Sequence, residues 1–171
     1  MSRLEEWNPW WEGKSTLPSD FIPRQIEIPS FNHTLSLTGV KYGGKTTFIH
    51  YFIQQHYPEA LYIPLSDPYF NPTSLSQYVE YYLKEINPSQ PIIILDDVEH
   101  PIEPIPDIKM ILISSYNHPT SLSLYPLRLS EMLQVKDPQT ALKHYLTYGG
   151  FPAVYLSQNK LPPLPIIIIP L

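Results

Sequence analysis

The sequence has no cysteine among its 171 residues. This absence excludes disulfide bonds, thiolate nucleophiles and zinc sites with cysteine ligands, and it leaves the redox compartment undetermined. Glycine is also scarce, with 6 residues against 21 prolines, which predicts stiff loops. The 43% hydrophobic and 16% charged content is typical of a globular protein, and the length suits one domain with one active centre.

Positive charge is scarce as well. The chain has 11 lysines and arginines against 16 acidic residues, for a net charge of -5, so no global basic field attracts nucleic acid or anionic lipid. Only Arg3, Arg24 and Arg128 are arginines, whereas a small-molecule or nucleotide kinase usually needs several to hold its phosphates. The six histidines show no pair at the spacing of a metal site.

Long apolar runs are absent too. The run at residues 166–169, among the longest, is bounded by prolines and is far shorter than the ~20 residues that span a bilayer. The first residues, MSRLEEWNPWWEG, lack the basic and then apolar pattern of a signal peptide. We therefore expect a cytoplasmic protein without a membrane role.

Strand-like and helix-like segments alternate along the chain. Strands are expected to begin at His33, Ala60, Pro91, Ile108 and Leu122, and helices to cover 46–56, 73–86 and 138–148. This alternation predicts an α/β fold, in which a parallel sheet with right-handed crossovers has helices on both faces.

Four segments are expected from the composition. Residues 1–32 form an N-terminal lead whose three tryptophans, Trp7, Trp10 and Trp11, are expected to pack against the domain. Residues 33–130 form the core, and 131–157 form a helical segment. Residues 158–171, rich in proline and isoleucine, are expected to be a truncation stump.

The segment from Gly39 to Thr46 reads GVKYGGKT and matches the phosphate-binding pattern G-x-x-x-x-G-K-[ST] between a strand and a helix. Its glycines allow the backbone N–H groups to wrap around phosphate oxygens at a helix N-terminus. Lys45 is expected to reach the β and γ phosphates, and the Thr46 hydroxyl to bind Mg²⁺. The predicted nucleotide contacts are Gly39, Val40, Lys41, Tyr42, Gly43, Gly44, Lys45, Thr46 and Thr47.

A pair of aspartates follows the apolar run that begins at Pro91. Asp96 is the candidate for the magnesium side of the site, and Asp97 for polarising the attacking water. Ser115 ends the next strand, where it either touches the γ phosphate or the water, or simply closes the strand. No Asn-Lys-x-Asp sequence follows this strand, which argues against a GTPase.

These motifs together resemble a prokaryotic group of AAA-type P-loop ATPases found mainly in Archaea, many of which carry a further C-terminal domain. The similar segments include Walker A (GVKYGGKTT), Walker B (LDDVEH), the strand end ILISS, the stretch LYPLRLSEML and the sequence Gly-Gly-Phe-Pro at 149–152. The resemblance implies ATP as ligand. It also implies a five-stranded sheet whose sensor strand, beginning at Ile108, lies between the phosphate-loop strand and the Asp96 strand.

The resemblance also adds Arg24, in Ile-Pro-Arg, to the nucleotide-contacting residues, and it implies that the chain is truncated after the ATPase core. This chain departs from the family where Asp97 replaces glutamate and Ser114 replaces the sensor glycine. No arginine stands between Tyr116 and Ser123, where the family carries one.

The main hypothesis is therefore a slow, Mg²⁺-dependent ATPase that couples its nucleotide state to a protein partner, a second copy of itself or a missing domain. The alternative is a nucleotide-binding scaffold or switch that has lost its arginine finger and does not hydrolyse ATP.

Overall fold

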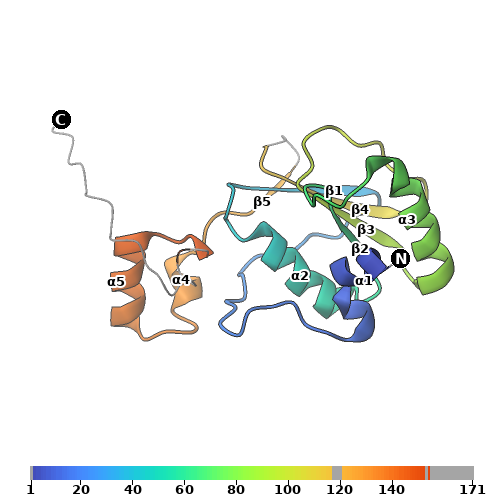
Figure 1. Ribbon diagram of the computed structural model, residues 1–171. Helices are drawn as coiled ribbons and strands as arrows, with labels where there is room; N and C mark the ends of the chain where they lie inside the picture. Colours follow the sequence, from blue (N-terminus) through green and yellow to red (C-terminus); the bar gives the residue numbers. More distant parts are fainter. Residues whose placement is uncertain (1, 117–120, 153, 155–171) are drawn as a thin grey trace.

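The computed structural model describes residues 2–116, 121–152 and 154, and Figure 1 shows a central sheet with helices packed around it. The strands are β1 (Thr34–Thr38), β2 (Leu61–Pro64), β3 (Ile92–Asp96), β4 (Lys109–Ser114) and β5 (Leu122–Ser123). They form one five-stranded parallel sheet in the order β2-β3-β4-β1-β5. The predicted α/β fold is confirmed, and β4 lies between β1 and β3 as the resemblance implied.

The helices agree with the sequence in part. Helix α2 spans Lys45–His56 and α5 spans Pro138–Tyr148, close to the predicted bounds. The segment predicted as one helix over 73–86 is composite, because a 3₁₀ turn (Pro72–Ser74), α3 (Leu75–Tyr81) and a π turn (Tyr82–Ile86) follow one another. Asn87, with φ 49°, ends the π turn by donating its N–H to the Tyr82 carbonyl. Asn87 precedes Pro88, and the proline ring disfavours the right-handed α conformation in the residue before it. The helical segment therefore ends here.

Three short elements were not expected from periodicity: α1 (Ser2–Trp7), a 3₁₀ turn (Pro9–Glu12) and α4 (Leu129–Met132). Each is too short to show a repeating apolar pattern. In Figure 1, α1 lies beside β2, whereas α4 and α5 lie together at the opposite end of the molecule.

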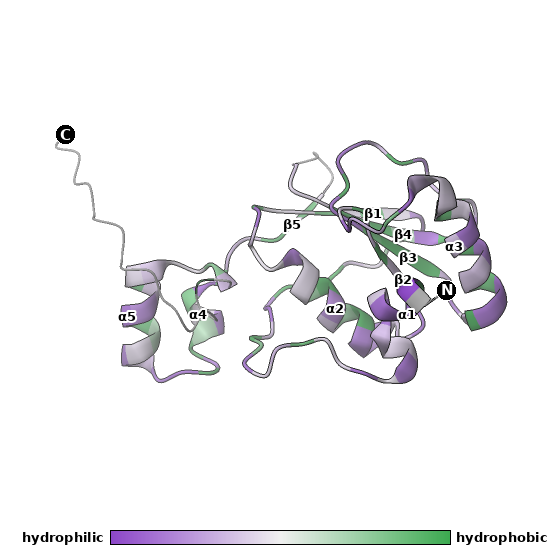
Figure 2. Ribbon diagram, viewed as in Figure 1, coloured by the Kyte–Doolittle hydropathy of each residue, from purple (hydrophilic) through white to green (hydrophobic). Residues whose placement is uncertain are grey.

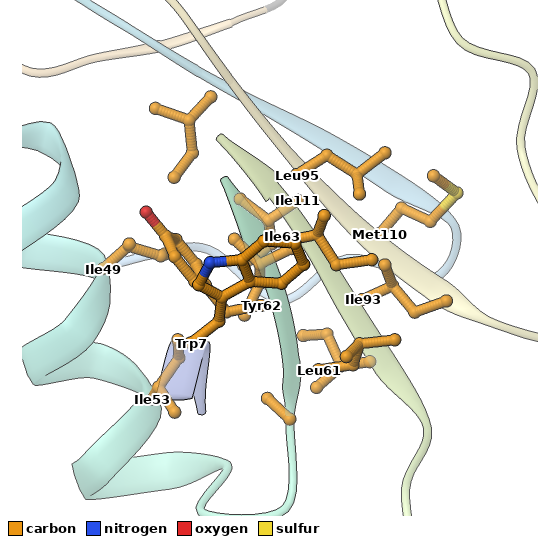
Figure 3. Packing of buried hydrophobic residues seen from close by; sticks show 14 of the residues in the cluster. Trp7, Ile49, Ile53, Leu61, Tyr62, Ile63, Ile93, Leu95, Met110 and Ile111 are labelled. Carbon is orange, nitrogen blue, oxygen red and sulfur yellow. The ribbon is translucent and has the colours of Figure 1, made fainter. Parts of the chain in front are cut away.

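The core lies between the sheet and the helices around it. All five residues of β3 are buried, as expected for a central strand of a parallel sheet, and Figure 2 shows β3 as hydrophobic. In Figure 3, Ile49 and Ile53 of α2 face the side chains of β2 and its neighbours. Trp7 and Trp10, at 8% and 4% exposure, belong to the same cluster.

The N-terminal lead attaches to the outer edge of β2. Asn8 is fully buried and exchanges two hydrogen bonds with the backbone of Tyr62, at 2.6 and 3.0 Å. The indole N–H groups of Trp10 and Trp11 both donate to the Ala60 carbonyl at 3.0 Å. Side chains of the lead therefore satisfy backbone groups that an edge strand leaves unpaired.

The C-terminal helices have a small apolar cluster of their own, formed by Ile22, Leu127, Met132 and Ala141. Gly150 packs directly against this region, because a Cβ atom there would stand 2.0 Å from the Leu127 carbonyl oxygen. The Gly-Gly-Phe-Pro sequence thus contains a glycine that permits close backbone approach. The predicted tail at 158–171 lies outside the described residues.

Candidate nucleotide-binding site

The loop after β1 adopts a conformation that depends on its glycines. Gly39 has φ 151° and Gly44 has φ 88°, both in the region that favours glycine. A Cβ atom on Gly39 would also stand 2.2 Å from the Leu124 carbonyl oxygen. Tyr42 adopts φ 64° without being glycine, and the Gly43 N–H donates to the Val40 carbonyl at 3.1 Å. The loop is therefore a tight turn that leads into the N-terminus of α2.

Lys45 extends back over this loop. Its ammonium nitrogen Nζ donates to the carbonyls of Gly39 and Val40, at 2.9 and 3.1 Å, and contacts the Ser115 hydroxyl at 3.4 Å. The side chain is buried, and this burial lowers the pKa of Lys45, whereas the charges of Asp96 and Asp97 raise it. The structure thus brings Lys45 and Ser115, predicted from separate motifs, to the same place.

Asp96 is a buried carboxylate with three hydrogen-bond donors. Its Oδ2 accepts from the Thr46 hydroxyl at 2.6 Å and from the Tyr62 hydroxyl at 2.8 Å. Its Oδ1 accepts the Asp97 N–H at 2.8 Å. Burial raises the pKa of Asp96, against the opposing effect of the Thr46 and Tyr62 hydrogen bonds, and the charge of Asp97 raises it further.

Tyr62 was not identified from the sequence. Pro64 pairs with Asp96 and Tyr62 with Ile94 in the register of β2 and β3, so Tyr62 and Asp96 lie on the same face of the sheet. Burial raises the pKa of the Tyr62 hydroxyl, and the Asp96 charge and hydrogen bond add to that rise, which keeps the hydroxyl a donor. Only the strand register, which no motif reports, could have revealed this contact.

Asp97 directly follows Asp96 but faces a different environment. Its backbone has φ 59°, and its exposed side chain accepts a hydrogen bond from the Ser66 hydroxyl at 2.6 Å. Ser66 and Asp97 line a pocket with His100 over apolar side chains such as Phe70. Ser66 is a second residue that sequence reasoning missed. Ser114, which replaces the family's glycine, is buried and accepts the Tyr116 N–H at 3.0 Å.

Arg24 binds the outside of the loop. Its guanidinium donates to Glu131 Oε1 at 3.1 Å and to the Gly43 carbonyl at 3.3 Å, and it also donates to the carbonyls of Tyr125 and Pro126. Arg24 therefore reaches the predicted nucleotide-binding loop through a backbone carbonyl. Its predicted contact with the nucleotide itself stays a prediction.

A mainly apolar pocket adjoins the phosphate loop on the side where Arg24 lies. Its lining comes from the lead, the start of α2 and the C-terminal segment, namely Phe21, Ile22, Arg24, Gly44, Thr47, Phe48, Leu127 and Pro152. It begins where α2 begins, so a ligand bound to the helix N-terminus through phosphate could extend into it.

The described residues contain no group of three or more histidine, cysteine or acidic side chains that could hold a metal ion. Thr46 and Asp96 nevertheless offer two hard oxygen donors 2.6 Å apart. This suits Mg²⁺, which takes one or two protein ligands and completes its shell with water and phosphate oxygens. Among the same residues, no helix is both long and apolar enough to cross a bilayer.

Comparison with known protein families gives a match. A family described as AAA domain matches residues 31–122, a range that holds β1 to β4, the first residue of β5, the phosphate loop and both aspartates. A comparison with curated proteins gives no match.

Proposed function

Because the chain belongs to the AAA domain family, we propose that it binds ATP with Mg²⁺ at residues 39–47 and hydrolyses it slowly to ADP and phosphate. The observation that carries this proposal is the convergence of Lys45, Thr46 and Asp96 at the carboxyl end of the sheet. An ammonium, a hydroxyl and a carboxylate at the start of one helix are the groups that a magnesium-bound triphosphate needs.

Binding would use the loop as follows. The backbone N–H groups of 39–47 would surround the β phosphate, and Lys45 would exchange its contacts with the Gly39 and Val40 carbonyls for phosphate oxygens. Thr46 and Asp96 would hold Mg²⁺, which supplies positive charge to the phosphates in the transition state. The base would enter the pocket lined by Phe21, Ile22 and Phe48, where apolar side chains can pack against its ring.

Hydrolysis would use Asp97 to orient and polarise the attacking water, and Ser115 to contact the γ phosphate. Asp97 is exposed and supports this role, since its carboxylate is open to water. The expected cytoplasmic location, and a protein partner or second copy that responds to the nucleotide through residues 131–157, belong to the same proposal.

The alternative is a protein that binds ATP without turnover, and the arginines favour it. Arg24 is engaged by Glu131 and the loop carbonyl, Arg3 pairs with Glu6, and Arg128 precedes α4, outside the sensor segment in which the family carries its arginine. An arginine at the γ phosphate is worth about 10³ to 10⁵ in rate. A chain that lacks one would bind ATP and act as a switch.

Titration calorimetry with ATP and Mg²⁺, together with a phosphate-release assay, tests the proposal. The Lys45→Ala variant should weaken ATP binding at least about tenfold, because it loses charge-assisted hydrogen bonds to phosphate. Lys143→Ala is the control, since Lys143 is an exposed lysine on α5, outside residues 39–47, and it should change the affinity much less. Equal binding by the parent and the Lys45 variant would refute the proposal.

Asp97→Asn separates hydrolysis from binding. If the protein is an ATPase, this variant should keep its affinity and lose about 10²-fold or more in phosphate release. If the parent binds ATP but releases no more phosphate than the Asp97 variant, the protein is a nucleotide-binding switch that does not hydrolyse ATP.

A further inference from the structure

The carboxylate of Asp96 is the point at which three parts of the chain meet. Thr46 belongs to the phosphate loop and α2, and the Asp97 N–H follows β3, so two of the three donors come from the recognised motifs. The third donor, the Tyr62 hydroxyl, comes from β2 and belongs to neither motif. It shares the oxygen Oδ2 with Thr46, so two hydroxyl groups fix the position of that one oxygen.

Tyr62 is itself held firmly. Figure 3 shows its side chain extending from β2 toward α2, near Ile49. Its ring packs edge-on against His50, with centroids 4.7 Å apart, and against Trp10 at 5.9 Å. Its backbone is bound on both sides by the buried amide of Asn8. A residue whose ring packs against α2 and the 3₁₀ turn, and whose backbone is bound by Asn8, can hold another group in place.

The histidine that packs against the ring is uncharged at neutral pH. Burial lowers the pKa of His50 to about 4, so its ring is neutral there. The Tyr62 hydroxyl, at 5% exposure for the whole residue, therefore has Asp96 as its hydrogen-bond acceptor and little contact with water.

We propose that Tyr62 is a positioning residue for the magnesium site, holding the Asp96 carboxylate in the orientation in which it serves the Mg²⁺ of a bound nucleotide. This inference rests on the proposed function, because it assumes that Mg²⁺ and nucleotide bind beside Thr46. Its physical basis is that hydrogen bonds to a metal-binding carboxylate fix the ligand's orientation and tune its affinity. Without the hydroxyl, Asp96 would be oriented by Thr46 and one backbone N–H alone.

A purely structural role for Tyr62 predicts something different. In that case, removing its hydroxyl would lower stability and leave the magnesium dependence unchanged. Tyr82 provides the matched control, since it is fully buried and its hydroxyl bonds to the backbone of Ile92, at 3.1 and 3.2 Å. Tyr62→Phe and Tyr82→Phe thus remove the same group from two buried tyrosines, only one of which touches Asp96.

The experiment measures the affinity for a non-hydrolysable ATP analogue by calorimetry, once with Mg²⁺ and once with a chelator, in the full chain. The ratio of the two affinities is the gain due to magnesium. Tyr62→Phe should reduce this gain about tenfold or more, the usual effect of losing such a partner, while the affinity in chelator stays at the parent value. Tyr82→Phe should leave both unchanged, although both variants should unfold at a lower temperature.

A double-mutant cycle with Asp96→Asn shows whether the effect passes through Asp96. In the Asp96→Asn background, Tyr62→Phe should cause no further loss of the magnesium gain. An unchanged gain in Tyr62→Phe, equal losses in both tyrosine variants, or additive losses in the cycle would each overturn the inference and leave the proposed function standing. A parent chain that binds no analogue in either condition would overturn both.

Discussion

Arg24 and Glu131 form an ion pair in which Nε and Oε1 are 3.1 Å apart, although the two residues are separated by 107 positions in the chain. Their side chains are 6% and 3% exposed. Glu131 also accepts the N–H groups of Gln25 and Arg128, both at 2.7 Å. Since Arg24 also binds the Gly43 carbonyl, the pair joins the lead, the phosphate loop and α4.

Arg24→Met should destabilise the chain by about 3 kcal/mol or more, because it leaves the Glu131 carboxylate buried without its cation. Urea unfolding measures this change. Arg3→Met is the control, since Arg3 pairs with Glu6 at the surface and surface pairs contribute about 1 kcal/mol or less. A similar loss of unfolding free energy in the two variants would mean that the buried Arg24–Glu131 pair stabilises the fold no more than a surface pair does.

Stability should fall as the pH drops from 6.5 to 4, because of His50. Its Nδ1 contacts the Thr16 hydroxyl, while its Nε2 is buried without a partner, and burial lowers its pKa from 6.5 to about 4. The unfolded chain therefore takes up a proton first, so this contribution is complete above pH 6.5 and is lost as the pH falls to 4. The loss from this group amounts to roughly 3 kcal/mol at most.

Urea unfolding at pH 7, 5.5 and 4 checks this prediction. His50→Phe should flatten the decline over that range, because phenylalanine fills the site without binding a proton. His33→Phe, at an exposed position, should keep the parent's decline. A parallel decline in the parent and the His50 variant would assign the acid sensitivity to other groups.

Gly39→Ala should destabilise the chain by several kcal/mol and weaken nucleotide binding. The added methyl group would meet the Leu124 carbonyl oxygen at 2.2 Å, at a backbone with φ 151°, so both steric overlap and backbone strain oppose it. Gly13→Ala separates the two causes, because Gly13 has φ 72° with nothing within 4 Å. That variant should lose only about 1 kcal/mol. If thermal unfolding showed the same loss of stability in Gly39→Ala and Gly13→Ala, steric overlap with the Leu124 carbonyl would not be the cause.

The sequence was sufficient for the parts of the fold that follow local patterns. The apolar runs placed β1 to β5 within a residue of their observed starts, because strands buried in a parallel sheet are apolar throughout. The proline and glycine boundaries placed α5 on Pro138–Tyr148. The short helices α1 and α4 escaped detection, since neither is long enough to show a helical period.

The residues of the candidate site likewise fall into two groups, those that sequence motifs predict and those that only the structure reveals. Lys45, Thr46 and Asp96 stand in motifs, and the structure brings them together. Tyr62 and Ser66 contact the two aspartates from β2 and the loop that follows it, and a tyrosine or serine in such a position has no distinctive spacing. The attachment of Arg24 to Glu131 depends on how distant segments pack, which local sequence does not encode.

Ser66→Ala should raise phosphate release about twofold or more without changing ATP affinity. The Ser66 hydroxyl donates to Asp97 Oδ2 at 2.6 Å, and its removal frees that oxygen to accept a proton from water. Steady-state kinetics measures the effect, with Ser76→Ala on the exposed face of α3 as the control. A loss of rate in the Ser66 variant would instead mean that the serine holds Asp97 in its productive position.

The hydrogen bonds from Asn8, Trp10 and Trp11 to Ala60 and Tyr62, at the outer edge of β2, join residues 49 to 54 positions apart. Without residues 8–11, these backbone groups would lie unpaired at an edge of the sheet, where a strand of another chain could pair with them. We therefore expect that removal of the tryptophan-rich lead would promote self-association through β2.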